Sequence, residues 1–195
     1  MGKKTVDIIP DARQLEQELK RERYKRRYRS TLRSTVYALI TVAAVAVLVA
    51  TLWMPVLQIY GSSMTPTMME GDIVISLKET EFKRGDIVAF YYGNRLLVKR
   101  YIAGSGSWVD IDEETGRITV DTQLLEEPYV LQHSFGYSDL EYPYQVPEEK
   151  HFLVGDHRET SVDSRHTTVG SIAEEFIVGK IVFRVWPLDR FGPVE

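Results

Sequence analysis

An uncharged stretch near the N-terminus constrains this chain more than any other feature. No charged residue occurs from Ser34 to Met69, and residues 35–52 (TVYALITVAAVAVLVATL) are almost entirely apolar. About 20 helical residues, each rising about 1.5 Å, cross a hydrocarbon layer about 30 Å thick. The sequence therefore predicts one transmembrane helix over residues 35–54. A cleaved signal peptide and a buried core helix are the competing interpretations, but the apolar core of a signal peptide is only about 7–15 residues long.

Charge is distributed unevenly on the two sides of this stretch. Residues 1–34 contain eleven Lys and Arg against five Asp and Glu, whereas residues 35–195 contain thirteen against twenty-three. By the positive-inside rule, the basic end stays in the cytoplasm. We expect a cytoplasmic basic tail over 1–34, the anchor over 35–54 and an extracytoplasmic domain over 55–195. An acidic body argues against nucleic acid as a partner, while the basic tail is suited either to anionic lipid or to plain solvation.

The chain contains no cysteine and only four histidines. The absence of thiols excludes a disulfide framework, a zinc ribbon, an iron–sulfur cluster and a cysteine nucleophile. The histidines follow none of the spacings typical of metal ligands. We therefore expect neither a metal site nor a cofactor.

The body after the anchor is typical of a mostly β, antiparallel fold. Short runs rich in β-branched and aromatic residues alternate with Gly, Asn and Asp, and no further segment has the 3.6-residue period of a helix. The segment 133–149 is polar, rich in Tyr and Pro, and predicts a long surface excursion. The predicted strands cover residues 73–77, 87–92, 96–102, 108–111, 117–120, 151–154 and 177–185.

One predicted hairpin places a lysine in an apolar strand. A two-residue loop at Gly93-Asn94 fixes the register, so that Val88 pairs with Lys99 and Phe90 with Leu97. Both faces of the second strand are then apolar. Burial disfavours the charged form of a lysine and lowers its pKa, and a neutral amine can accept a proton from a serine. The alternative is that the head group of Lys99 reaches solvent or pairs with a carboxylate.

A short turn directly after the anchor contains the candidate partner of this lysine. The sequence Gly61-Ser62-Ser63-Met64-Thr65-Pro66-Thr67 combines small residues with a proline that stops a helix, and leaves Ser63 exposed on a stiff turn. Alone, such a stretch indicates only a turn.

Together, these segments resemble the bacterial type I signal peptidases, membrane-anchored serine proteases with a Ser–Lys dyad, and in particular their Gram-positive form. The resemblance extends from the anchor to about Lys180. It rests on ordered blocks, namely Ser63–Thr67, Arg84–Val88, Val98–Arg100, Glu127–Tyr129, Gly155–Arg158 with Ser161–Arg165, and Val178–Lys180.

The resemblance implies a role for each matching residue. Ser63 would be the nucleophile of an acyl-transfer reaction and Lys99 its general base. Ser161 would orient the lysine amine. The supporting residues of the site would be the ion pair of Asp163 and Arg165, together with Asp156 and Arg158 of the same loop.

The family cuts after small residues in an A-x-A pattern, and the substrate would bind as an extended strand at a sheet edge. We expect Met64 and Leu97 to line the first pocket, with Leu57, Ile59 and Val74 as weaker candidates. Two positions depart from the usual pattern. Gly61 stands where some members have a serine that donates to the oxyanion, so that the Ser63 N–H is the first expected donor and the second donor stays open. His157 stands where the family usually has asparagine.

The resemblance also implies partners and leaves alternatives. Preproteins with signal peptides would be the substrates, the lipid bilayer would hold the anchor, and contact with secretion machinery stays open. A self-cleaving repressor-type protease has a related fold and the same dyad, but would have a DNA-binding domain in place of the anchor. A catalytically inactive, membrane-tethered scaffold is the alternative from another class, and it would have no need for Ser63, Lys99 and Ser161 together.

Overall fold

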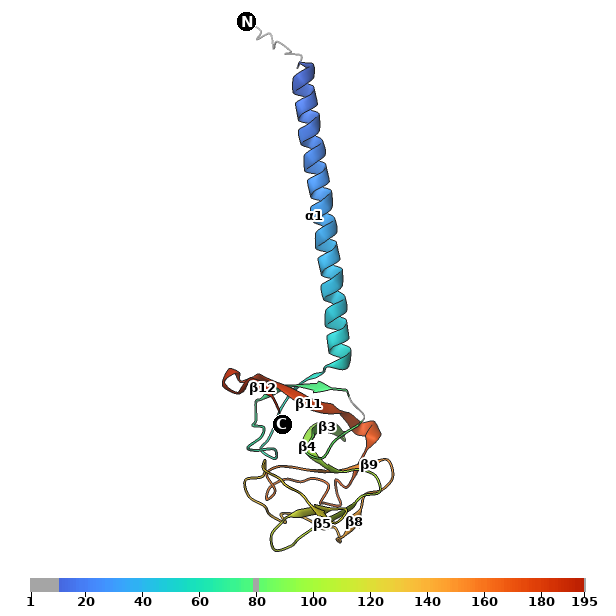
Figure 1. Cartoon of the computed structure of the whole chain (residues 1–195), viewed down its shortest axis with the longest axis vertical. Coiled ribbons are helices and arrows are strands. Elements are labelled where there is room, and N and C mark those ends of the chain that lie inside the picture. The colour runs from blue at the N-terminus through green and yellow to red at the C-terminus, as the bar shows by residue number, and fades with distance from the viewer. Residues whose placement is uncertain (1–10, 79–80, 195) are drawn as a thin grey trace. The chain divides into compact units, whose positions relative to one another are not determined.

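The computed structural model describes residues 11–78 and 81–194, which divide into an N-terminal unit ending at Val49 and a C-terminal unit beginning at Ala50. One long helix, α1 (Ala12–Trp53), contains every described residue of the N-terminal unit after Asp11 (Figure 1). The rest of the described chain forms β-strands, turns and two short 3₁₀ helices, η1 (Glu174–Phe176) and η2 (Leu188–Arg190).

Helix α1 is 42 residues long and begins well before the predicted anchor. No glycine or proline interrupts residues 12–53, and ion pairs one turn apart, such as Glu16–Lys20 at 3.6 Å, support its charged first half. A helix of this length extends about 63 Å, roughly twice the thickness of the hydrocarbon layer. Only its apolar second half can therefore lie within a membrane. It is the one helix of the described chain that is long and apolar enough to span a bilayer.

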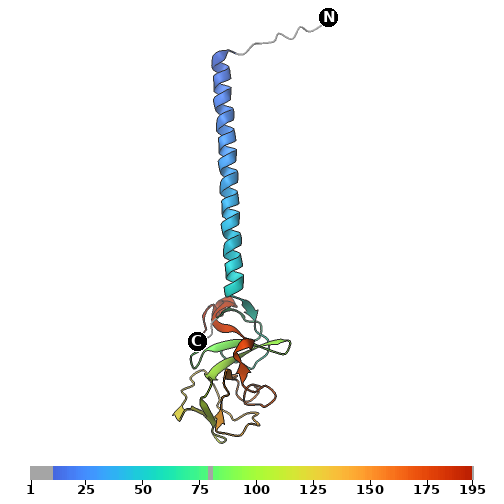
Figure 2. The same cartoon turned by 90° about the vertical axis from the view of Figure 1, so that its right-hand side faces the viewer.

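The strands of the C-terminal unit are antiparallel, as the sequence predicts, and they form two separate sheets. Strands in the larger one follow the order β1-β2-β11-β3-β4-β9-β10, with β12 paired to β11. Their bounds are β1 (Val56–Gln58), β2 (Ile73–Leu77), β3 (Ile87–Tyr92), β4 (Arg95–Ala103), β9 (Lys150–Val154), β10 (Ile172–Ala173), β11 (Ile177–Trp186) and β12 (Gly192–Pro193). The smaller sheet, in the order β7-β6-β5-β8, consists of β5 (Trp108–Ile111), β6 (Ile118–Val120), β7 (Gln123–Leu124) and β8 (Tyr144–Gln145). The two sheets occupy opposite ends of this unit (Figure 1), and the turned view of Figure 2 shows the same separation.

All seven predicted strands are present, with bounds that differ from the prediction by at most one residue at either end. The hairpin register is also confirmed, because Val88 lies opposite Lys99 and Phe90 opposite Leu97. Five short strands, β1, β7, β8, β10 and β12, were not predicted. Each contains only two or three residues, too few for an alternating pattern to be recognised.

Buried side chains gather in three clusters on the faces of these sheets. Ala89 of β3 packs with Met64 and Val74 on one face of the larger sheet, while Val88 and Phe90 pack with Leu153 on the other. Residues of the smaller sheet, among them Ile118, pack with Phe152 of β9 in a third cluster. The segment 133–149 is mostly irregular, as expected, but it is not purely a surface excursion: partly buried side chains anchor it to the third cluster, namely Phe135, Leu140, Tyr142 and Tyr144.

Candidate functional site

Ser63 and Lys99 come into contact beside strand β4 of the larger sheet. Ser63 lies in the series of turns that follows β1, and Lys99 lies in the middle of β4. The Nζ atom of Lys99 donates to the Oγ atom of Ser63 over 2.6 Å. The two residues are 36 positions apart in the chain, and the fold joins them as the sequence analysis expects.

The lysine is almost completely removed from solvent, with only 3% of its surface exposed. Burial lowers the pKa of Lys99 from 10.5 to about 8, because desolvation penalises the ammonium form. Asp163 opposes this effect, Arg165 adds to it, and Asp156 opposes it more weakly. A serine hydroxyl in contact with an amine of lowered pKa is the arrangement that activates a nucleophile.

The loop after β9 packs directly on the turn that contains Ser63. The backbone N–H of His157 donates to the carbonyl oxygen of Ser63 over 3.1 Å. Gly155 permits this approach, since a Cβ atom at that position would lie 2.6 Å from the same carbonyl oxygen and 2.1 Å from the Oγ of Ser161. The Ser161 side chain is fully buried, and its Oγ has no hydrogen-bond partner within the described part of the chain. This hydroxyl makes no hydrogen bond to Lys99, so the expected orienting contact is not formed here.

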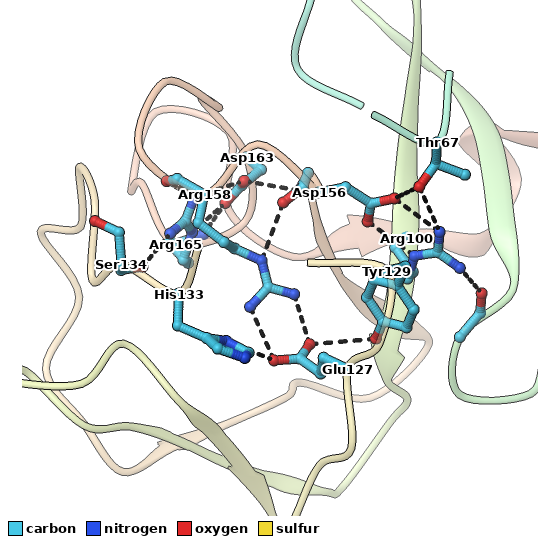
Figure 3. Close-up of polar contacts among 12 residues, drawn as sticks. Thr67, Arg100, Glu127, Tyr129, His133, Ser134, Asp156, Arg158, Asp163 and Arg165 are labelled. Atoms are coloured by element: carbon cyan, nitrogen blue, oxygen red, sulfur yellow. Dashed lines mark hydrogen bonds and ion pairs between the residues drawn. The ribbon is translucent and has the colours of Figure 1, made fainter. Parts of the chain in front are cut away.

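Asp163 and Arg165, further along this loop, form the expected ion pair (Figure 3). The Nε and Nη2 atoms of Arg165 donate to the two carboxylate oxygens of Asp163 over 2.9 and 3.0 Å. Burial raises the pKa of Asp163, but the hydrogen bonds and charge of Arg165 outweigh it and hold that pKa below its ordinary value. The carboxylate therefore stays ionised near Lys99. Arg165 also donates to the carbonyl oxygens of Phe135 and Arg158, which fastens the 133–149 segment to the site.

Asp156 and Arg158 belong to two further buried ion pairs whose partners the sequence analysis did not assign to the site. Arg100 donates to both oxygens of Asp156, over 2.8 and 2.7 Å, and Arg158 donates to both oxygens of Glu127, over 3.1 and 2.5 Å (Figure 3). Breaking such a pair by removing one partner typically costs about 3–5 kcal/mol. These pairs therefore hold the loop firmly against the sheet.

Tyr129 and Thr67 join the two pairs into one network. The guanidinium of Arg100 lies 3.6 Å from the centre of the Tyr129 ring, and the Tyr129 hydroxyl donates to Glu127 over 3.2 Å. Thr67, four residues after Ser63, donates to Asp156 over 2.6 Å. The sequence shows Arg100 as a second charged residue in a strand of apolar residues, but it does not show that Asp156 is its partner.

A groove opens beside the dyad between two strand edges. A cavity of about 690 Å³ is bordered by β1 and by the first residues of β4, and a narrow pocket of about 30 Å³ adjoins it at Ser63. β9 pairs with β4 only at positions 100–103, and β1 pairs only with β2, so within the described chain both edges facing the groove are unpaired. An extended peptide can add to such edges by backbone hydrogen bonds.

Four of the five expected pocket residues border this groove. Met64, Ile59 and Leu97 line the narrow pocket, and Leu57 lines the wider cavity. Val74 does not: it is fully buried in the core cluster with Met64. The described residues include no group of three or more His, Asp or Glu that could hold a metal ion.

Comparisons with known proteins point to one family. The family described as "Signal peptidase, peptidase S26" matches residues 32–186. The chain is 34% identical over 153 residues to Signal peptidase IB of Staphylococcus aureus, a match that covers 68% of this chain and 78% of that protein. It is also 34% identical over 147 residues to Thylakoidal processing peptidase 1, chloroplastic, of Arabidopsis thaliana, with 67% of this chain and 41% of that protein covered. The chain thus spans less than half the length of the chloroplast relative.

Among solved structures, a signal peptidase I from Enterococcus faecalis V583 matches with 24% sequence identity and a TM-score of 0.43. This match covers 51% of the present chain and 96% of the other.

Proposed function

The chain belongs to the signal peptidase family, peptidase S26, and we propose that it is a membrane-anchored serine endopeptidase that removes signal peptides from secreted preproteins. One observation supports this activity above all. The buried amine of Lys99 contacts the hydroxyl of Ser63 over 2.6 Å at the end of an open groove.

The proposed reaction is acyl transfer through Ser63. The Oγ atom attacks the carbonyl carbon of the scissile bond while Lys99 accepts its proton, and the resulting oxyanion is stabilised by the backbone N–H of Ser63. Collapse of this intermediate breaks the C–N bond, and the Lys99 ammonium protonates the leaving amine. Water, deprotonated by Lys99, then attacks the acyl-enzyme. The bond between the acyl carbon and the Ser63 Oγ breaks, the Lys99 ammonium returns the proton to Ser63, and the signal peptide leaves with a free carboxylate.

The lowered pKa supports Lys99 as the base. With a pKa of about 8, roughly one tenth of the lysine is neutral at pH 7, whereas an ordinary lysine with a pKa of 10.5 is neutral at well under one part in a thousand. When the pKa of a base lies near the working pH, a sizeable fraction of it is unprotonated and its affinity for a proton is still high.

The supporting residues keep this base in place. We assign Asp163 and Arg165 the role of fixing the second half of the loop after β9 near Lys99. Asp156 and Arg158 would fix the first half of the same loop, through their ion pairs with Arg100 and Glu127. Ser161 has a buried hydroxyl with no partner in the described chain. We assign it the role of receiving the Lys99 amine when that amine turns from Ser63 toward the leaving group.

The narrow pocket supports cleavage after small residues. A volume of about 30 Å³ holds little more than one or two waters, and so accommodates an alanine side chain better than a large one. Met64, Ile59 and Leu97 would exclude larger groups sterically. Residues further from the bond would lie extended between β1 and β4, in contact with Leu57.

The apolar half of α1 would hold the enzyme in the membrane that contains its substrates. We propose that the basic N-terminal part stays in the cytoplasm and that the β-rich unit lies outside, by the positive-inside rule. The predicted partners are therefore preproteins and the lipid bilayer, with no role for nucleic acid.

The decisive experiment compares cleavage of a preprotein with an A-x-A site by the full chain and by two variants in proteoliposomes. Ser63→Ala and Lys99→Ala should each lower kcat by at least about 10³-fold, because nucleophile and base act as a unit. Ser105→Ala and Lys150→Ala, at exposed positions, are the matched controls and should retain activity. Wild-type kcat/KM should also rise between pH 6 and about pH 8, as Lys99 loses its proton.

Two results would contradict this proposal. Wild-type cleavage rates from folded Lys99→Ala would remove the lysine from the mechanism. A folded wild-type chain that binds preproteins without cutting them would support the inactive scaffold instead.

A further inference from the structure

His157, at which this chain departs from its family, lies beside the nucleophile and contacts Thr65 through its side chain. Its Nδ1 atom is 3.2 Å from the Oγ1 atom of Thr65, and this Oγ1 donates to the carbonyl oxygen of Ser62 over 2.8 Å. The backbone N–H of Thr65 donates to the same carbonyl over 3.1 Å. The three residues therefore form a short chain of hydrogen bonds that ends on the peptide group immediately before Ser63.

The direction of these bonds follows from counting protons. A carbonyl oxygen can only accept, so the single hydroxyl proton of Thr65 points to Ser62. The Thr65 oxygen must then accept from His157, which requires a proton on Nδ1. The chain runs from His157 to Thr65 to the Ser62 carbonyl, and it forms whether or not Nε2 is also protonated.

The carbonyl of Ser62 and the N–H of Ser63 belong to one planar peptide group. Fixing the carbonyl therefore fixes the direction of the N–H that is to stabilise the oxyanion. Hydrogen bonds in series also polarise one another, so two donors on the carbonyl oxygen make this N–H a stronger donor. Gly61 has no side chain to add a further donor, which leaves this N–H with a larger share of the task.

His157 also holds the peptide group on the other side of Ser63. Its backbone N–H donates to the Ser63 carbonyl over 3.1 Å. A single residue of the loop after β9 thus restrains both peptide groups that flank the nucleophile, one through its backbone and one through its side chain.

We propose that Thr65 and His157 are positioning residues that orient and polarise the Ser62–Ser63 peptide group as the oxyanion donor of this enzyme. The inference rests on the proposed peptidase function. Neither side chain touches the substrate in this account, so both act on the rate of the chemical step and leave substrate binding unchanged.

The test measures kcat and KM of the full chain in proteoliposomes on the same preprotein, with Thr65→Val and His157→Leu. Each variant removes one donor while keeping the side-chain size similar, and His157 lines a cavity of about 280 Å³ that leaves room for leucine. Each should lower kcat about tenfold with KM within about twofold. The double variant should be little worse than either single one, because both interrupt the same chain of bonds.

Conservative variants separate positioning from folding. Thr65→Ser and His157→Asn each retain a donor at the required place and should restore kcat to within about threefold of wild type. Thr119→Val, the same chemical change in β6 of the smaller sheet, should leave kcat unchanged. If His157→Leu fails to fold, the Thr65→Val and Thr65→Ser pair still decides the question.

The proposal is overturned if Thr65→Val retains wild-type kcat, if the loss appears in KM alone, or if the losses in the double variant simply multiply. These outcomes leave the proposed function intact as long as wild type cleaves and Ser63→Ala does not. Failure of the wild type itself would overturn the peptidase assignment.

Discussion

A lysine that is 3% exposed in an apolar strand lowers the stability of the fold it belongs to. Lowering its pKa from 10.5 to about 8 corresponds to about 3 kcal/mol of differential stabilisation in favour of the neutral amine. Such a destabilising residue is retained where the neutral amine is useful. At the scale of single residues, stability and proposed activity therefore make opposite demands on position 99.

Lys99→Met should reveal this cost as a dependence of stability on pH. Between pH 8 and 10.5 the unfolded amine is protonated and the folded one is not, so the wild-type free energy of unfolding rises with pH across this window. Below pH 8 the free energy of unfolding of Lys99→Met should exceed that of wild type by about 2 kcal/mol. This figure is the cost of burying the amine, reduced by the loss of the Lys99–Ser63 hydrogen bond. Denaturant unfolding of the full chain in detergent at pH 7 and pH 10 measures the difference. If the unfolding free energies of wild type and Lys99→Met differ by the same amount at both pH values, burial of Lys99 does not lower its pKa.

Among the elements, the loop after β9 links the sheet to the turn that contains Ser63 at a point of close contact. Gly155 has no room for a side chain, whereas Gly106, in the turn between β4 and β5, has nothing within 4 Å of the place that a Cβ atom would occupy. Gly106 has a φ of +80°, so a residue with a side chain there is strained without touching any neighbour.

Gly155→Ala should therefore lower both activity and stability, since the new methyl must displace Ser161 or the carbonyl of Ser63. We expect a loss of about 100-fold in kcat and about 2 kcal/mol in unfolding free energy. Gly106→Ala should cost about 1–2 kcal/mol through backbone strain and leave kcat unchanged. Preprotein cleavage and thermal unfolding of the two variants provide the comparison. Equal kcat values in both would show that the close contact has no catalytic consequence.

Local signals in the sequence explain which parts of this architecture could be predicted. The β3–β4 hairpin was predictable because a two-residue loop determines the pairing, and with it the position of Lys99. The partner of Arg100 was not, because Asp156 lies 56 residues away and reaches it only through the pairing of β4 with β9. The proposed role of Ser63 came from the family resemblance, since a turn of small residues has no distinctive pattern of its own.

At the scale of the whole molecule, the absence of cysteine makes the proposed orientation directly measurable. Gln17→Cys in α1 and Glu113→Cys between β5 and β6 each introduce the sole thiol of the chain at an exposed position. In intact bacterial cells a membrane-impermeant maleimide should label position 113 and should label position 17 only after the membrane is permeabilised. The reverse pattern would place the β-rich unit in the cytoplasm.

The two unpaired strand edges beside Ser63 also bear on the fate of the enzyme's own anchor. Edges of this kind recognise a chain by its open backbone, and a helix has already used its amide groups internally. Helix α1 continues without interruption to Trp53, and its A-x-A sequence, Ala44-Val45-Ala46, lies within the helix. Under the proposed activity, resistance to self-digestion thus comes from the helical conformation of this segment rather than from its side chains. An apolar segment is not cleaved as long as it remains helical.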